Sequence, residues 1–294
     1  MDFYKLSSAL ITCMLFVVID VHVEGIEIEK ELRLSSLEKQ KLEKFKITVK
    51  QIPSQDWQKS DLALIRWLRG HNLNIQQAET AFKANLKWRE ENKIDSILDD
   101  DWTNFQDNFY FDDTGTDYAG RPVIAADVSE WDVRNAVVSG DADNLVRYMF
   151  RAVESGATRV RKSQENGQNV TQWQVVLNMD SFNLVQHGCL QCKYFFLQKN
   201  CQLKFCTPII AGLPVYLRFI TAHEAYYPFG ADKIIIINTP AAFEIVLNLV
   251  RPVMSSAMRD SLHVFGTNKA VWKKFLLSLI PGDQLGSHFG GTKL

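Results

Sequence analysis

The chain has 294 residues, of which 46% are hydrophobic and 23% are charged, and its formal net charge at pH 7 is -1. This length and apolar content suffice for the core of one large domain or of a small and a large lobe. A nearly neutral chain without a block of basic residues lacks the attraction to phosphates on which nucleic-acid binding depends, so we expect no nucleic-acid partner.

The first 25 residues differ in composition from the rest of the chain. Lys5 precedes a mostly apolar run over residues 9–19, and residues 23–25 offer small or modest side chains to a signal peptidase. The run is too short to span a bilayer and is soon followed by Asp20. The pattern favours a cleaved signal peptide over residues 1–25 and a secreted protein. A membrane-leaning or buried helix of a cytoplasmic, peripheral protein is the alternative.

Residues 35–98 alternate apolar and charged side chains at helical spacing, which predicts several short helices in a small N-terminal lobe. The segment Asn74-Ile75-Gln76-Gln77-Ala78-Glu79 is typical of a helix start, because an asparagine side chain can accept hydrogen bonds from the free N–H groups of the first turn.

Apolar strands alternate with helical patterns in the second half of the chain, which predicts an α/β lobe. We expect strands over Val123–Ala126, Gln174–Met179 and Ile234–Ile237. The last of these contains four consecutive isoleucines with no polar alternation. Such a strand is buried on both faces, as in a parallel sheet covered by helices on each side.

Asn169-Val170-Thr171 is the chain's single Asn-x-Ser/Thr acceptor triplet, and it lies in a polar stretch from Arg161 to Gln172 that we predict to be a surface loop. The triplet agrees with export, but it arises easily by chance in a chain of this length.

The interval from Lys193 to Gly212 interrupts the pattern, because its Pro208 would split one helix in two. Cys192-Lys193-Tyr194 can be encoded with a splice-donor sequence and Ala211-Gly212 with an acceptor, and removal of the interval keeps the reading frame. We interpret residues 193–212 as a retained intron. A genuine insertion is the alternative.

Four cysteines lie in or near this interval, and two interpretations of them stay open. They could ligate zinc, or they could form two disulfides if the chain is exported. The spacing between the last two is wide for zinc, and both belong to the suspect interval, so we expect no metal site. The four are Cys189, Cys192, Cys201 and Cys206.

No motif for catalysis is present: the chain has no nucleophile elbow, no phosphate-binding glycine loop and no His-Glu-x-x-His helix. The histidines are scattered without a shared spacing. We therefore expect neither an enzyme nor a cofactor.

The segment from Tyr226 to Thr292 carries ordered landmarks. These are Tyr226-Tyr227-Pro228, the isoleucine strand, Asn238-Thr239-Pro240, a long apolar helix, and Phe289-Gly290-Gly291-Thr292. Their order resembles the C-terminal half of the CRAL-TRIO lipid-transfer domain, the family of yeast phosphatidylinositol-transfer protein and α-tocopherol transfer protein. Three N-terminal segments resemble the same family, which extends the resemblance over roughly residues 35–292. They are Asp61–His71, Leu86–Arg89 and Tyr118–Val123.

The resemblance implies an α/β fold in which a small N-terminal helical lobe, residues 35–98, precedes a CRAL-TRIO lobe, residues 110–292. The second lobe would hold a central, mostly parallel sheet covered by helices, with a lipid cavity. The apolar helix over Ala241–Met258 resembles the family's gate, which would open at a membrane. The cavity and gate candidates are Phe182, Tyr226, Phe243, Leu247, Val250, Met254 and Met258.

Arg251 is the candidate contact for a lipid head group. In family members that bind phosphatidylinositol, a basic residue before a proline of the gate helix contacts the head group, and Arg251-Pro252 matches that position. The acidic residue that accompanies it is replaced here by Phe229, which puts phosphoinositide binding in doubt. We retain Arg251 because a guanidinium group pairs well with phosphate or carboxylate.

Taken together, these patterns predict a monomer that binds and transfers a hydrophobic small molecule or a phospholipid and that contacts a membrane surface transiently. The alternative is a regulatory module that senses a lipid and recruits a protein partner.

Overall fold

The structure, a computed structural model, describes residues 28–182, 187 and 213–293. The predicted signal peptide and the whole suspected intron, 193–212, lie outside these ranges, as do all five cysteines of the chain. Within them, none of the helices combines the length and the apolar character needed to cross a membrane.

A small helical lobe opens the described chain, as predicted. The side chain of Asn74 accepts a hydrogen bond from the backbone N–H of Gln77 and so caps the helix predicted there. Phe45, Leu64 and Phe82 are fully or almost fully buried in the centre of this lobe. Its elements are α1 (Ile28–Glu31), α2 (Ser36–Val49), η1 (Asp56–Lys59), α3 (Asp61–Gly70), α4 (Ile75–Glu91) and η2 (Ile94–Ser96).

The second lobe is built on a five-stranded sheet in the order β1-β2-β3-β4-β5. Strand β1 is antiparallel to β2, and the other neighbours are parallel. The three predicted strands are confirmed, with shifts at their ends, whereas β1 and β5 were not predicted. The strands are β1 (Phe111–Asp112), β2 (Val123–Asp127), β3 (Trp173–Asn178), β4 (Ala231–Thr239) and β5 (Leu262–Gly266).

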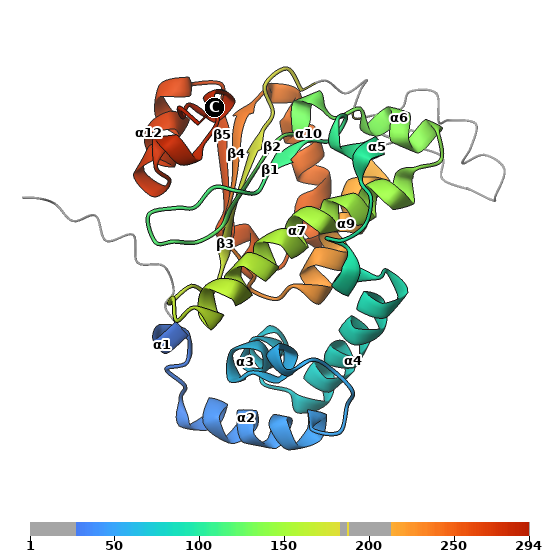
Figure 1. Cartoon of the computed structure of the whole chain (residues 1–294), viewed down its shortest axis with the longest axis vertical. Coiled ribbons are helices and arrows are strands. Elements are labelled where there is room, and N and C mark those ends of the chain that lie inside the picture. Colours follow the sequence, from blue (N-terminus) through green and yellow to red (C-terminus); the bar gives the residue numbers. More distant parts are fainter. Residues whose placement is uncertain (1–27, 183–186, 188–212, 294) are drawn as a thin grey trace, which may run out of the picture.

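Helices cover both faces of this sheet. Figure 1 shows α12 on one side, and α7, α9 and α10 on the other, with the helical lobe below. Buried side chains of β4 alternate between the two layers: Ile235 and Ile237 pack toward α12, and Ile236 packs toward α7. The prediction of a strand buried on both faces is therefore confirmed.

The helices of this lobe are α5 (Thr103–Gln106), α6 (Val133–Val138), α7 (Ala142–Glu165), α9 (Leu213–Tyr226), α10 (Ala241–Val250), α11 (Ser256–Ser261) and α12 (Lys269–Leu279). Short 3-10 turns connect them, η3 (Val128–Glu130), η4 (Arg251–Val253), η5 (Gly282–Gln284) and η6 (Ser287–Phe289).

The predicted surface loop from Arg161 to Gln172 is only partly a loop. Helix α7 continues to Glu165, and the backbone then folds back so that Thr171 and Gln172 are buried before β3. Gln164 stabilises the return by donating a hydrogen bond to the carbonyl oxygen of Val170 at 2.7 Å. The prediction was wrong for residues 161–165, which complete a helix, and for the buried end of the loop, where a polar side chain satisfies a buried backbone group.

The apolar helix predicted over Ala241–Met258 is broken into three pieces. Helix α10 ends at Val250, η4 spans Arg251–Val253, and α11 begins at Ser256. Pro252 lacks the N–H that would continue the helix. Ser255 then caps α11, since its hydroxyl oxygen accepts a hydrogen bond from the N–H of Met258 at 3.1 Å.

At the two glycines of Phe289-Gly290-Gly291-Thr292, the backbone conformation and the close packing leave no room for a side chain. Gly290 has φ +77, which L side chains rarely adopt, and a Cβ on Gly291 would lie 2.0 Å from the carbonyl oxygen of Leu285. The turn thereby brings the C-terminal segment against the α12 face of the sheet, where Leu285 and Phe289 are buried.

A buried ionic cluster joins the helical lobe to α7. Arg89 of α4 donates hydrogen bonds to Glu154 of α7, 3.0 Å away, and Arg161 donates to the same carboxylate at 2.7 Å. The hydroxyl group of Tyr227 also donates to Glu154, at 2.8 Å. Burial alone would raise the pKa of Glu154, but the neighbouring Arg89 and Arg161 charges hold it below its ordinary value.

Candidate functional site

An apolar cavity of about 200 Å³ lies between the sheet and the layer of α7, α9 and α10. Because side chains alternate along a strand, every second residue of β2, β3 and β4 points into it. Two rows that run across the three strands form this wall. They are Ile124, Val175 and Ile234, and Ala126, Leu177 and Ile236.

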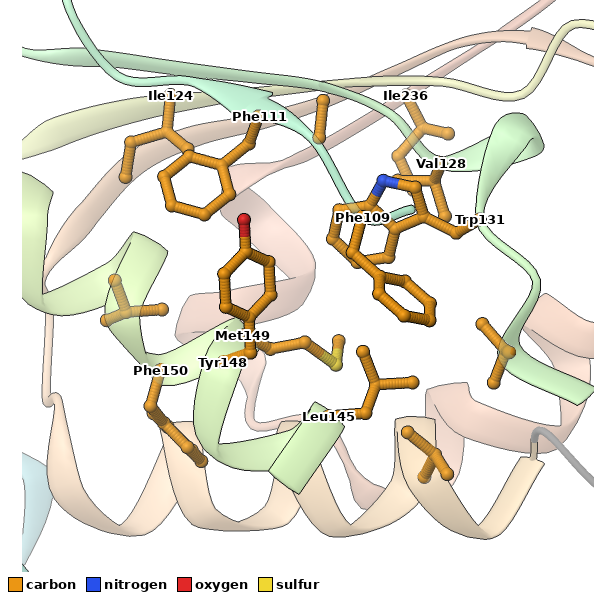
Figure 2. Packing of buried hydrophobic residues seen from close by; sticks show 14 of the residues in the cluster. Phe109, Phe111, Ile124, Val128, Trp131, Leu145, Tyr148, Met149, Phe150 and Ile236 are labelled. Atoms are coloured by element: carbon orange, nitrogen blue, oxygen red, sulfur yellow. The ribbon is translucent and has the colours of Figure 1, made fainter. Parts of the chain in front are cut away.

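Three helices supply the opposite walls at helical spacing. Met149, Ala152 and Val153 of α7 recur at intervals of three and four residues, as expected for one face of a helix. Figure 2 shows Phe111, Ile124 and Ile236 pointing from the sheet toward Tyr148 and Met149 of α7. The other two helices contribute Tyr216, Phe219, Ile220 and His223 from α9, and Phe243, Val246, Leu247 and Val250 from α10.

Six of the eight candidate residues lie on this cavity. Phe182 packs edge-on against Phe243, with ring centroids 5.6 Å apart, and both lie at the α10 side. The inner face of α10, the turn after it and α11 contribute the remaining four, so these parts of the chain form one wall of the cavity. The six are Phe182, Phe243, Leu247, Val250, Met254 and Met258.

Tyr226 and Arg251 lie elsewhere. The Tyr226 ring stacks on Trp88 of α4 at 4.5 Å and is placed at the junction with the helical lobe. Arg251 is 46% exposed, and its guanidinium nitrogen lies 3.6 Å from a carboxylate oxygen of Glu244. Contact of either residue with a ligand stays a prediction.

The sequence patterns missed the sheet wall and the α7 and α9 walls. Strand alternation could have identified Ile234 and Ile236, and the apolar spacing of α7 could have identified Met149. The polar members, Tyr216 and His223, are seven residues apart and therefore share one face of α9. Helical periodicity in that segment was obscured by the preceding interval.

The cavity is electrostatically neutral. Among the described residues that line it, none is an aspartate, glutamate, lysine or arginine. Burial lowers the pKa of His223 to about 4, so this imidazole is uncharged at neutral pH, and burial raises the pKa of Tyr216. The Tyr216 hydroxyl is hydrogen-bonded to Nδ1 of His187 at 2.8 Å.

Within 28–182, 187 and 213–293, His, Cys, Asp and Glu side chains nowhere gather in threes that could hold a metal ion. The two cysteine interpretations fall outside these ranges.

The comparison with protein families decides the identity of this fold. Residues 207–291, which include β4, α10, β5 and α12, match the CRAL/TRIO domain. The chain carries a CRAL/TRIO domain. The matched segment contains the cavity wall of α10 and the landmarks from Tyr226 to Gly291, so the resemblance seen in the sequence is confirmed. CRAL/TRIO domains are mostly non-enzymatic and bind lipophilic molecules.

Two curated relatives extend the similarity toward the N-terminus of the CRAL/TRIO chain. The CRAL-TRIO domain-containing protein T23G5.2 of Caenorhabditis elegans is 23% identical over 266 residues, which are 89% of this chain and 34% of that protein. Protein real-time of Aedes aegypti is 23% identical over 264 residues, which are 88% of this chain and 38% of that protein. The chain thus spans somewhat over a third of the length of these relatives.

A solved structure supports the same fold for this CRAL/TRIO protein. The crystal structure of Sfh5 superposes with a TM-score of 0.61 at 14% sequence identity, covering 82% of this chain and 84% of that one. At such low identity the likeness concerns the fold. It confirms the predicted class, in which N-terminal helices precede a mostly parallel sheet covered by helices.

Proposed function

We propose that this CRAL/TRIO protein holds one hydrophobic molecule in the apolar cavity and transfers it between membranes without a chemical step. The observation that carries the proposal is the neutral, apolar lining of the cavity on the inner face of α10. An apolar ligand gains free energy in such a cavity because its surface leaves water. The four methionines of the lining suit ligands of variable shape, since thioether side chains adapt easily.

Helix α10 has two apolar faces, which supports its role as a gate. Leu247 points into the cavity and is only 1% exposed, whereas Leu249 on the outer face is 48% exposed. Ile245 and Val253 lie at four-residue intervals from Leu249, so the three form an exposed apolar stripe along α10 and η4. Such a stripe can enter the interfacial region of a bilayer, where opening of the gate would place the ligand among lipid chains.

The breaks around η4 supply points at which this wall can move. Pro252 removes one backbone hydrogen bond, and the chain is extended at Met254 before α11 begins. A gate needs such breaks, because hinge motions are absorbed by a few residues at the ends of rigid elements.

Two substitutions of the same residue type on the same helix test the gate. We expect Leu247→Asp to abolish ligand uptake, because it places an unpaired charge in an apolar cavity. Leu249→Asp should leave uptake from detergent solution intact but slow transfer between phosphatidylcholine vesicles at least several-fold, because it weakens contact with the bilayer. Ligand content by native mass spectrometry, vesicle transfer and thermal unfolding are measured for both.

Several outcomes would count against the proposal. Normal transfer by a folded Leu247→Asp protein would remove α10 from the transfer path. If the wild-type chain binds a lipid but moves none between vesicles, the alternative of a lipid-sensing module that recruits a protein partner is favoured.

Export through the secretory pathway is a separate proposal that rests on the pattern of residues 1–25 alone. N-terminal sequencing after expression in a secreting cell tests it. A new N-terminus at Ile26 supports export, and a cytosolic protein that retains Met1 contradicts it.

A further inference from the structure

Positive charge is concentrated in the first part of the helical lobe, around α2. Residues 28–71 contain ten lysines and arginines and six aspartates and glutamates, an excess of four positive charges, whereas the whole chain has a formal net charge of -1. Five of these lysines lie between Ser36 and Lys50, that is, on α2 and its C-cap. Figure 1 shows α2 at the end of the helical lobe that faces away from the sheet.

The two glutamates of α2 do not compensate its lysines, because both are paired elsewhere. Glu38 accepts a hydrogen bond from Arg69 of α3 at 2.9 Å, and a carboxylate oxygen of Glu43 lies 2.8 Å from the ammonium group of Lys46. The same ammonium group lies 2.8 Å from Asp61. Four lysines therefore remain without an ion pair among the described residues. They are Lys39, Lys41, Lys44 and Lys50.

Helix α4 of the same lobe shows the usual arrangement of charges on a solvated helix. Lys83 pairs with Glu79 at 2.6 Å and Lys87 with Glu91 at 3.6 Å, each partner being four residues away. Such pairs leave little net charge on the surface. In α2, by contrast, no acidic residue lies three or four positions from Lys44 or from Lys50, so the sequence itself denies them a partner on the helix.

An exposed isoleucine lies among these lysines. Ile47 is 74% exposed, more than any other large apolar side chain in the described part of the chain. Lys44, Ile47 and Lys50 follow one another at intervals of three residues and therefore share the outer face of the helix. Leu37, which is 52% exposed, lies two turns before Lys44 on the same side. Apolar side chains among lysines are typical of helices that lie at a lipid surface.

We propose that the outer face of α2 docks the protein on an anionic lipid surface. Four unpaired lysines on one amphipathic helix suffice for attraction to acidic lipids, and the fluid head groups can adapt to their spacing. The ammonium groups remain in water while their aliphatic stems and Ile47 reach the interfacial region. The contact goes beyond the proposed function, which brings only α10 and η4 to a bilayer, and it would select the membranes that the protein visits.

The composition of this face argues against a protein partner. The centres of protein–protein interfaces are depleted of lysine and are built around clustered aromatic or other apolar side chains. The outer face of α2 offers the reverse, with lysines on both sides of one exposed isoleucine. A lipid surface needs no packed apolar centre, because its attraction is mainly electrostatic.

Vesicle binding measures this contact. The purified full chain is sedimented with vesicles of phosphatidylcholine alone and with vesicles that also contain about 30% phosphatidylserine. We expect about tenfold tighter binding to the second kind. This preference should disappear when the salt concentration rises from about 0.1 M to about 0.5 M, because salt screens charges at an exposed surface.

Matched double variants locate the contact. Lys44→Gln with Lys50→Gln removes two unpaired charges and should weaken binding to the phosphatidylserine vesicles about twentyfold. Lys83→Gln with Lys87→Gln is the control on α4: it removes two charges that are already paired with glutamates, and binding should weaken less than about threefold. Thermal unfolding reports whether each variant is folded.

A single variant tests the apolar part of the face. Ile47→Ser should weaken binding to the phosphatidylserine vesicles about fivefold and leave its salt dependence unchanged, because one aliphatic side chain no longer leaves water. Unchanged binding of folded Lys44→Gln with Lys50→Gln overturns the inference. Equal weakening by the two double variants overturns it as well, since the attraction would then come from the helical lobe as a whole.

The wild-type chain provides a test that does not depend on any variant. Equal binding to the two kinds of vesicle overturns the inference and favours an acidic protein as the partner of this face. That result leaves the proposed function intact, because ligand transfer is measured between phosphatidylcholine vesicles that contain no anionic lipid.

Discussion

The two faces of the sheet are built from alternate residues of the same strands, but they are packed differently. On the α12 face, Trp272, Leu276, Ile280 and Leu285 are fully or almost fully buried against Ile235. The α7 face borders the apolar cavity, and two buried polar atoms on this face lack a partner among the described residues. One face is therefore closely packed, and the other leaves an apolar cavity unfilled by its own side chains.

The two faces also differ in the hydrogen bonding of their tryptophans, Trp272 and Trp173. Trp272 on the α12 face donates its N–H to Asn238 Oδ1 at 2.8 Å, where Asn238 is itself held by Asn178. Trp173 on the cavity face donates to nothing in the described protein. The indole N–H is therefore satisfied on the α12 face and unsatisfied, among the described residues, on the cavity face.

The largest expected effect comes from two neighbouring isoleucines of β4. Ile235→Ala removes a fully buried side chain from the α12 face and should cost about 4 kcal/mol in the free energy of unfolding. Ile236→Ala, on the cavity wall, should cost only about 2 kcal/mol, because that side chain already borders a void. Urea denaturation of both variants measures the difference. Equal losses would mean that the two faces are equally well packed.

A second prediction concerns the turn at Gly290 and Gly291, which holds the C-terminal segment against the α12 face of the sheet. Gly291→Ala should destabilise the protein by about 3 kcal/mol, because the new Cβ would meet two backbone oxygens and force the chain to move. Gly266→Ala is the control: a Cβ there meets nothing within 4 Å, and stability should change by less than about 0.5 kcal/mol. Thermal unfolding compares them, and an unaffected Gly291→Ala protein would contradict the role given to the turn.

The last prediction is a pH dependence that arises mainly from two buried histidines, His187 and His223. Burial lowers the pKa of His187 and of His223 to about 4, so the unfolded chain binds more protons than the folded one between about pH 6.5 and 4. Stability should therefore be complete above pH 6.5 and fall as the pH decreases, by about 2 kcal/mol per histidine at pH 5. Thermal unfolding from pH 7 to 5 measures this loss.

The variant His223→Phe provides the control, because it should remove about half of that dependence. The carboxyl group of Glu154 contributes little in this window, since its pKa is held below the ordinary value and its protonation occurs at lower pH. Unchanged stability of the wild type between pH 7 and 5 would show that the two imidazoles are not buried as described.

Most of the fold was predictable from local pattern. Consecutive isoleucines in β4 are possible only where both faces of a strand are covered, and the cap at Asn74 is decided by one side chain and the first turn of its helix. Strand β1 was missed because it has two residues, and β5 because its residues are only half buried. Short or partly exposed strands depend on their neighbours more than on their own residues.

The sequence by itself determined the family landmarks, the covered sheet and the inner residues of α10, because each follows from periodicity or from backbone demands such as those of Gly290 and Gly291. Tertiary structure alone decided that Arg251 and Tyr226 lie away from the cavity and that Trp173 lies on it with a free N–H. The reason is physical. Periodicity states which side of an element faces inward, but the partner of a buried polar atom comes from segments distant in the chain, and only their packing determines whether that partner exists.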